Sequence, residues 1–402
     1  MYFKLNANSI FIKGGNCSVI YNAVNGTYEE IPSESAGYIE FLENGNRVED
    51  FEEVDIGLLK KLESLELGKF YDNNVYVDKV RYGNPHGIYP IPTKVSKIYI
   101  QISEQCNLDC YFCNDTKVNR VTGCKIYKED GRIDKEAYIK FINSSYLLGC
   151  RNMYILGGEP LLHKDLVSIL IKTAHKRGYD NIYIYTNAFL LDSEFLSEHE
   201  QVNYIVHTIA HNESMFSKIT ESTKFNEYEN NIRLINKENL FFNLLITPHT
   251  YQSREDIIEY LKAFEPKGMI CSYIFEETND DTYNSIIMDT KFRSNCISDM
   301  QFFNNVNFHP CLNNMLTLFS NGDVGVCPMM RDDTIGNISE MSLEKILYDK
   351  KQEQYWELPL KDINYCGDCG YRIICNDCRA IEASQTGNLY GKKYCKMLQG
   401  MK

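Results

Sequence analysis

The stretch SEQCNLDCYFCN, residues 103–114, is the most informative part of this chain, because it spaces three cysteines as C-x3-C-x2-C. They are Cys106, Cys110 and Cys113, and they follow an apolar, strand-like run at 95–103. Three thiolates on one short loop can hold three irons of a [4Fe–4S] cluster and leave the fourth iron open to another ligand. A disulfide framework favours an even count of wider spacings, and a zinc ribbon needs a fourth ligand close by. The spacing therefore predicts an iron–sulfur cluster loop.

Composition sets broad limits on function. The 402 residues suggest two to four domains, and 44% of them are hydrophobic, as in an ordinary globular protein. No run of eighteen apolar residues is present, so we expect no membrane span. Fifteen cysteines without an export signal indicate the reducing cytoplasm, with thiolates committed to metal. The net charge of −13 argues against nucleic acid as a partner, because such binding relies on neutralising phosphates.

Strand and helix patterns alternate over residues 93–280. Six apolar runs predict strands at 95–103, 153–156, 182–185, 204–208, 240–246 and 269–275. One helix is expected to begin at Asp134, and another to end at Gly178 after turning Leu166, Ile169, Leu170 and Ala174 inward. Six strand–helix units predict an α/β fold, with a parallel sheet curled into a partial (β/α)6 barrel. Functional groups then belong at the C-terminal strand ends, where the cluster loop falls.

Residues 1–80 form a piece of their own. Short β-type runs come first, and Asn25-Gly26 is a strong hairpin signal between two of them. Ser33 is expected to cap a first helix, and a second helix carries Leu58, Leu59, Leu62 and Leu65 before a last strand near 75–77. Strands followed by helices in this short length predict a small winged-helix-like domain. A purely structural N-terminal cap is the alternative. The proline-rich segment 83–92 then serves as a joint.

The C-terminal third carries a second set of cysteines. Cys311 and Cys327 flank a hairpin whose tight turn is Asn321-Gly322. After a gap, a segment of thirty residues holds five more cysteines: Cys366, Cys369, Cys375, Cys378 and Cys395. So many cysteines in a cytoplasmic chain indicate metal ligands, and paired C-x2-C spacings suit zinc as well as iron–sulfur clusters. Residues 281–310 are expected to link this region, 311–402, to the barrel.

The cluster loop, the GGEP turn at 157–160 and the later Thr-Asn pair together resemble the radical S-adenosylmethionine (radical SAM) enzymes. The resemblance implies that Phe112 packs on the adenine of S-adenosylmethionine. It implies that the GGEP turn, formed by Gly157, Gly158, Glu159 and Pro160, binds the methionyl amino group. Thr186 and Asn187 would contact the ribose or the carboxylate. Glycines allow close approach of the backbone, and a carboxylate accepts from an ammonium, so these residue types suit those roles.

The C-terminal cysteines resemble the SPASM domain, which binds two auxiliary [4Fe–4S] clusters. By that resemblance, Cys311, Cys327 and Cys378 serve the first auxiliary cluster. The second is held by Cys366, Cys369, Cys375 and Cys395. Two residues separate Cys375 from Cys378, where the family usually has three. The fourth ligand of the first auxiliary cluster stays open between Cys296 and no cysteine at all.

The resemblance implies a peptide-modifying enzyme. Reduction of the cluster would cleave S-adenosylmethionine to a 5′-deoxyadenosyl radical, with a flavodoxin or ferredoxin as electron donor. Residues 1–80 would grip the leader of a ribosomally made precursor peptide, which receives a thioether or carbon–carbon cross-link or is epimerised. A sulfatase-type maturase that makes formylglycine is one alternative, and a non-catalytic iron–sulfur or zinc scaffold is another.

Several other residues carry weaker signals. His207 and His211 lie near a barrel strand end, where one could contact substrate or cofactor, although lone histidines more often simply satisfy local hydrogen bonds. An acidic run at 276–281 could supply a general base, but acidic runs on loops are usually solvated, and we assign no base from the sequence. Four cysteines without cluster spacing are expected to be buried small apolar residues: Cys17, Cys124, Cys150 and Cys271.

Overall fold

The computed structural model describes all residues except 16, 80–93, 114–132, 275–296 and 400–402. The chain folds into two compact units. The barrel unit comprises residues 92–285 and 314–355, and the composite unit comprises residues 1–91, 286–313 and 356–402. In the described residues, none of the helices combines the length and the apolar character needed to pass through a bilayer.

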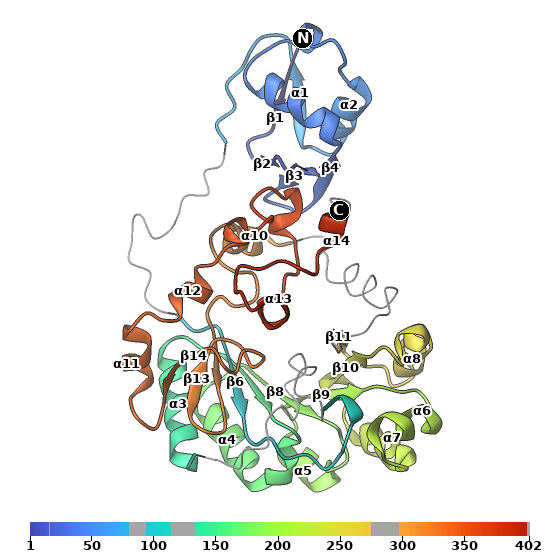
Figure 1. Ribbon diagram of the computed structural model, residues 1–402, viewed down its shortest axis with the longest axis vertical. Coiled ribbons are helices and arrows are strands. Elements are labelled where there is room, and N and C mark those ends of the chain that lie inside the picture. The colour runs from blue at the N-terminus through green and yellow to red at the C-terminus, as the bar shows by residue number, and fades with distance from the viewer. Residues whose placement is uncertain (16, 80–93, 114–132, 275–296, 400–402) are drawn as a thin grey trace. The chain divides into compact units, whose positions relative to one another are not determined.

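A nine-stranded sheet lies at the centre of the barrel unit (Figure 1). Its order is β11-β10-β9-β8-β7-β6-β12-β13-β14. Strands β6 to β11 run parallel to one another. Their bounds are β6 Lys97–Gln101, β7 Asn152–Leu156, β8 Asn181–Thr186, β9 Asn203–Thr208, β10 Leu240–Ile246 and β11 Gly268–Tyr273. The predicted parallel α/β sheet is confirmed.

Helices cover the outer side of this sheet (Figure 1). They are α3 Lys135–Leu147, α4 Lys164–Arg177, α5 Ser193–Glu198, α6 Glu213–Thr220, α7 Phe225–Leu234 and α8 Arg254–Lys262, with single 3-10 turns η3 Tyr111–Cys113, η4 Pro160–His163, η5 Lys237–Asn239 and η6 Tyr251–Ser253. As predicted, Asp134 caps α3, its carboxylate accepting from the Ala137 N–H at 2.8 Å. Gly178 ends α4 at φ +95°, in the left-handed region that favours glycine.

Two details of the helices differ from the sequence-based expectation. Helices α5 and α6 were not predicted, because six and eight residues are too few to establish a helical period. In α4, Val167 and Ile171 are fully buried, whereas Leu166 and Ile169 are only partly buried. The buried face of α4 is therefore displaced by about one residue from the face predicted from the sequence.

The barrel sheet continues into the cysteine-rich region. Strand β12 (Met315–Leu318) pairs in parallel with β6, and β13 (Asp323–Gly325) and β14 (Thr334–Asn337) extend the sheet in antiparallel fashion. The predicted turn between β12 and β13 is confirmed, with Gly322 at φ +91°. The pairing with β6 was not predicted. Two helices follow, α11 Leu343–Tyr348 and α12 Glu353–Trp356.

The first eighty residues hold two small sheets and two helices. Strands β2 (Ser9–Ile12), β3 (Ser18–Asn22) and β4 (Tyr28–Ile31) form an antiparallel sheet, and β1 (Tyr2–Leu5) pairs with β5 (Gly68–Tyr71). The helices are α1 Ser33–Glu43 and α2 Ile56–Ser64, with the 3-10 turn η1 Val48–Asp50 between them. The predicted hairpin turn is confirmed, because Gly26 has φ +73°.

Two expectations for this region were wrong. The last strand lies at 68–71 and not near 75–77. Helix α1 starts at Ser33 itself, and its N-cap is Pro32, which has no side chain able to accept a hydrogen bond. Proline is well suited to a helix start because its missing N–H would have no helical partner there.

Both faces of the β2-β3-β4 sheet contribute side chains to a hydrophobic core of the composite unit. One face carries Ile20 and Ile31 into a core with α1 and α2. The other face carries Val19 and Tyr21 into a second core, whose remaining members include Phe302, Tyr371 and Ile373. The last three come from α10 (Asp299–Asn307) and the 3-10 turn η8 (Gly370–Ile373). The N-terminal sheet therefore shares a core with cysteine-rich residues near the C-terminus.

The composite unit ends in short helices: η7 Leu360–Asp362, α13 Arg379–Thr386 and α14 Lys396–Gln399. The predicted joint at 83–92 lies outside the described residues, as does most of the predicted linker at 281–310. The domain boundaries proposed from sequence, 1–80, 93–280 and 311–402, remain a proposal.

Candidate functional site

The cluster loop borders a hollow of about 480 Å³ in the barrel unit. Cys106, Cys110 and Cys113 all line it, together with Phe112, whose side chain is 2% exposed. The loop follows β6 directly, so the thiols lie at the C-terminal end of a barrel strand, as predicted. The sequence-predicted cysteine triplet is thus brought together around one space.

Asn187 ties the cluster loop to the end of β8. Its Nδ2 donates to Asn107 Oδ1 at 2.7 Å and lies 3.6 Å from the sulfur of Cys106. Its Oδ1 accepts from the Phe189 N–H at 3.2 Å. Asn187 also lines the hollow, so this predicted cofactor residue lies beside the cysteines.

The two glycines after β7 allow the backbone to approach the cluster loop. The Gly158 N–H donates to the Ser103 carbonyl at 2.9 Å, and the Glu159 N–H donates to the Gln105 carbonyl at 2.8 Å. A Cβ atom on Gly158 would stand 2.2 Å from the Gln105 oxygen, and one on Gly157 would stand 2.4 Å from the Ser103 oxygen. The glycines are therefore required for contact between two protein segments, and of the two only Gly158 lines the hollow.

Glu159 is fully buried and heavily hydrogen-bonded. Its carboxylate accepts from the Asn187 N–H at 2.7 Å, the Leu161 N–H at 3.0 Å and the Thr186 hydroxyl at 2.9 Å. Burial nevertheless raises the pKa of this carboxyl to about 7. Glu159 and Thr186 do not line the hollow, and neither does Pro160. Contact of these three with S-adenosylmethionine remains a proposal.

His207, a weak candidate from the sequence, lines the hollow. Its ring stacks on Tyr185 at 5.5 Å, and its Nδ1 lies 3.2 Å from Asn243 Nδ2. Asn243 Oδ1 accepts from the Ser272 hydroxyl at 2.8 Å. With the amide donating to Nδ1, the neutral ring carries its proton on Nε2. The other histidine considered, His211, does not line the hollow.

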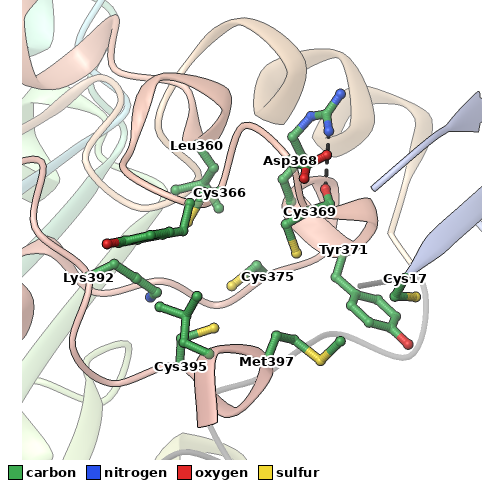
Figure 2. A pocket seen from close by; sticks show the side chains of 13 residues that line it. Cys17, Leu360, Cys366, Asp368, Cys369, Tyr371, Cys375, Lys392, Cys395 and Met397 are labelled. Carbon is green, nitrogen blue, oxygen red and sulfur yellow. Dashed lines mark hydrogen bonds between the residues drawn. The ribbon is translucent and has the colours of Figure 1, made fainter. Parts of the chain in front are cut away.

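A second hollow, of about 690 Å³, lies within the composite unit and is drawn in Figure 2. Cys366, Cys369, Cys375 and Cys395 line it, which is the complete set predicted for the second auxiliary cluster. Burial raises the pKa of the Cys366 thiol to about 12 and raises the pKa of the Cys375 thiol as well. Metal binding at this hollow must therefore displace thiol protons.

The set predicted for the first auxiliary cluster is divided between the units. Cys327 is buried in the barrel unit, whereas Cys311 and Cys378 belong to the composite unit. Cys378 does not line the second hollow, consistent with a separate assignment. Cys296 lies outside the described residues. This ligand set remains a proposal.

The cysteines without cluster spacing have different environments. Cys150 is fully buried, as predicted. Cys271 is exposed on β11, the edge strand of the sheet, so the expectation of burial was wrong there. Cys17 is only partly buried and lines the second hollow. Cys124 and the acidic run at 276–281 lie outside the described residues.

Comparison with known families assigns both regions. Residues 100–264 match the radical SAM superfamily, and residues 310–370 match SPASM, an iron–sulfur cluster-binding domain. The chain contains a radical SAM domain and a SPASM domain. The SPASM match includes Cys311, Cys327, Cys366 and Cys369 and ends before the last three cysteines. The prediction of an enzyme of the radical SAM superfamily is confirmed.

Solved structures share the fold of this radical SAM–SPASM chain. Streptococcus suis SuiB bound to the precursor peptide SuiA aligns at TM-score 0.56 and 15% identity, covering 99% of this chain and 100% of SuiB. The anSMEcpe protein with bound AdoMet aligns at TM-score 0.57 and 17% identity, covering 76% of this chain and 94% of anSMEcpe. At these identities the likeness shows the fold alone.

Curated relatives of the radical SAM–SPASM chain include GTP 3′,8-cyclases. The protein of Synechocystis sp. is 25% identical over 177 residues, which are 43% of this chain and 52% of that protein. The protein of Clostridium botulinum is 28% identical over 99 residues, 25% of this chain and 30% of that protein. The chain spans about half the length of these relatives or less.

The side chains present fit the groups that the two domains imply. A radical SAM domain implies a [4Fe–4S] cluster and S-adenosylmethionine, and a SPASM domain implies auxiliary iron–sulfur clusters. Three thiols around the first hollow suit a cluster with one open iron, and four thiols around the second suit a closed one. Within the described ranges, no three metal-binding side chains already converge on one point.

Proposed function

We propose that this chain is a radical SAM peptide maturase that installs a thioether or carbon–carbon cross-link in a ribosomally synthesised precursor peptide. When bound and reduced, the [4Fe–4S] cluster supplies cleavage of S-adenosylmethionine to a 5′-deoxyadenosyl radical, which abstracts hydrogen from the peptide. The proposal places that cluster on Cys106, Cys110 and Cys113.

The observation that carries the proposal is the extent of the likeness to SuiB. The alignment with SuiB bound to its precursor peptide covers 99% of this chain and so includes the N-terminal sheet and helices. The alignment with anSMEcpe covers 76% of this chain. A maturase that recognises a leader needs a region that a barrel with SPASM alone does not supply. We therefore assign residues 1–80 to leader recognition.

The N-terminal sheet offers an edge for an added strand. Strand β4 is an edge of the β2-β3-β4 sheet, and of its four residues only Ile31 is buried. Glu29 of β4 forms an ion pair with Lys61 of α2, so a peptide strand added at β4 would run beside that helix. Main-chain hydrogen bonds to the edge would supply affinity, and contacts with α2 would supply selectivity.

Residues around the first hollow position the reactants and exclude water. Phe112, Phe216 and Leu245 give the hollow an apolar wall that suits an adenine ring. Asn187 holds the cysteine loop in register with the end of β8. The Nε2–H of His207 is available to donate to a polar group of the bound cofactor or peptide. Keeping water out protects a radical from side reactions.

Further assignments belong to the same proposal. Cys366, Cys369, Cys375 and Cys395 would hold an auxiliary cluster, which would supply an acceptor for the electron left over when the cross-link forms. A flavodoxin or ferredoxin supplies electrons to the first cluster, in the cytoplasm. The structural similarity to anSMEcpe favours a sulfatase-type maturase as the alternative function. That alternative assigns no role to the N-terminal region.

The decisive experiment is an anaerobic reaction of reconstituted enzyme with the short peptide encoded beside its gene, read by mass spectrometry. Loss of two hydrogens from the peptide, with 5′-deoxyadenosine formed, is the expected result. A product aldehyde would indicate the sulfatase-type alternative, and unchanged mass with deuterium uptake would indicate epimerisation. GTP serves as the comparison substrate, because its turnover would place the enzyme with the curated cyclases.

A matched substrate tests leader recognition without altering the enzyme. The same peptide lacking its leader should show a much higher KM, whereas cleavage of S-adenosylmethionine without peptide should be unchanged. Equal KM values for the two peptides would show that residues 1–80 have another role.

A further inference from the structure

A buried network of charged side chains lies beside the second hollow. At its centre is Asp377, between Cys375 and Cys378, whose side chain is 0% exposed. Its carboxylate accepts from Arg379 through two nitrogens and lies 3.4 Å from His309 Nε2. His309 Nδ1 in turn accepts from the Cys311 N–H at 3.1 Å. The network thus connects segments that carry cysteines of both predicted auxiliary clusters.

The same network reaches the last cysteine through Glu382. This carboxylate accepts from the backbone N–H groups of Lys393 and Tyr394, the two residues that precede Cys395. Arg379 donates to the carbonyls of Leu389 and Gly391, a short distance upstream. The segment that carries Cys395 is therefore fixed by charge-assisted hydrogen bonds.

Lys392 is the member of this network that also lines the hollow. Its Nζ donates to Asp377 Oδ1 at 2.6 Å and lies 3.2 Å from Glu382 Oε1, and its side chain is 5% exposed. Figure 2 shows the amino group directed toward the space between the cysteines. An ammonium carries three N–H donors, so at least one is left for the hollow. Asp377, Arg379 and Glu382 do not line it.

Two other charged side chains line the hollow, Asp368 and Arg372. Both are engaged with neighbouring backbone. Asp368 Oδ1 accepts from the Gly15 N–H at 3.0 Å. Arg372 donates to the carbonyls of Gly367 and Cys369, both at 3.1 Å. Of the two lining cations, Arg372 donates to the loop that carries Cys366 and Cys369, whereas Lys392 does not.

We propose that Lys392 raises the reduction potential of the auxiliary cluster held by Cys366, Cys369, Cys375 and Cys395. Adding one electron makes a cluster more negative, and a fixed positive charge inside a dry pocket stabilises that form. A cluster that accepts an electron from a closing peptide radical must be easy to reduce, so the inference rests on the proposed function. Asp377 and Glu382 act as positioning residues that hold the ammonium in place.

Neutral replacement of Lys392 leaves the surrounding carboxylates partnered. Asp377 keeps both nitrogens of Arg379 and the ring of His309, and Glu382 keeps its two backbone N–H donors. The Lys392→Met variant has a side chain of similar length without charge. Lys392→Gln retains two N–H donors, and Lys392→Arg retains the charge. Lys393→Met is the matched control, because Lys393 is the exposed neighbour.

The test is an anaerobic redox titration followed by electron paramagnetic resonance. It uses full-length protein in which Cys106, Cys110 and Cys113 are replaced by alanine, so that only auxiliary clusters give a signal. In Lys392→Met and Lys392→Gln, one cluster should become at least tenfold harder to reduce, which is 59 mV for a one-electron couple. Lys392→Arg and Lys393→Met should titrate like the parent, with equal iron and sulfide.

Three outcomes would overturn the proposal, and the potential and the metal content distinguish them. An unchanged potential with full iron content would refute the role of Lys392 and leave the cluster assignment intact. Loss of the cluster from both neutral variants, with retention in Lys392→Arg, would show that the ion pairs only hold the loop together. A parent protein that contains zinc or no iron would refute the cluster assignment itself, and the proposal with it.

Discussion

Replacement of Gly158 by alanine should damage the cluster loop without touching a cysteine. The added Cβ would lie 2.2 Å from the Gln105 oxygen and 2.6 Å from the Glu104 oxygen. Real Cβ contacts essentially never fall below 3.0 Å. Because the Gln105 oxygen is a backbone atom, the loop itself must move away by about 0.8 Å. Cys106 follows Gln105 directly, so the displacement reaches the first cluster ligand.

The expected cost follows from two terms. Overpacking of this kind costs about 1–3 kcal/mol, and each of the two backbone hydrogen bonds between the turn and the loop contributes about 1 kcal/mol when lost. If both hydrogen bonds are lost, we expect the free energy of unfolding of the metal-free protein to fall by about 3–5 kcal/mol. Urea unfolding followed by far-UV circular dichroism measures this fall, and iron per chain after reconstitution measures the effect on the loop.

The matched control is Gly37→Ala in α1. Nothing lies within 4 Å of a Cβ atom at this exposed helical position. Alanine there should stabilise the protein by about 0.5–1 kcal/mol, because glycine is the poorer helix former. If Gly158→Ala is as stable as the parent and binds as much iron, the close approach of turn and loop does not exist as described.

Three further predictions concern single side chains. Cys110→Ala should abolish formation of 5′-deoxyadenosine. The control Cys271→Ser, at an exposed position of an edge strand, should leave it unchanged. Cleavage of S-adenosylmethionine by Cys110→Ala would contradict the cluster assignment. Because the folded protein holds the Glu159 proton up to a pKa of about 7, its free energy of unfolding should fall as pH rises from about 4.5 to 7, by about 3 kcal/mol from this group. Glu159→Gln should remove that pH-dependent part, and an identical pH slope in variant and parent would refute it. Tyr21→Phe removes a buried hydroxyl that donates to the Gly370 carbonyl at 2.6 Å, and should cost about 1–3 kcal/mol in thermal or urea unfolding; no measurable cost would show that this hydrogen bond is absent in solution.

Local sequence signals predicted local structure well. The cap at Asp134, the end of α4 at Gly178 and the turn at Gly322 depend on a few neighbouring residues, and the structure has each of them. The four cysteines that the SPASM resemblance assigns to the second auxiliary cluster lie around one hollow. The pairing of β12 with β6 could not be predicted, because it joins residues more than two hundred positions apart.

The chemistry of individual side chains was harder to predict than their location. A carboxylate in a GGEP turn indicates a ligand for an ammonium, but the sequence does not show that Leu161, Thr186 and Asn187 already donate to Glu159. Lys392 gives no signal in the sequence, because its partners Asp377 and Glu382 and the hollow beside it depend on the folded arrangement. Burial and partnership arise from tertiary contacts and have no short-range pattern.

The core that the N-terminal sheet shares with α10 and η8 bears on enzyme engineering. Val19 and Tyr21 cover Phe302, Tyr371 and Ile373, so a chimera that receives a foreign leader-binding segment would leave those apolar side chains facing water. If residues 1–80 bind the leader as proposed, exchanging them alone would not transfer substrate scope, because the new segment would lack its matching core. A successful graft must transfer the matching surface of α10 and η8 together with the new segment.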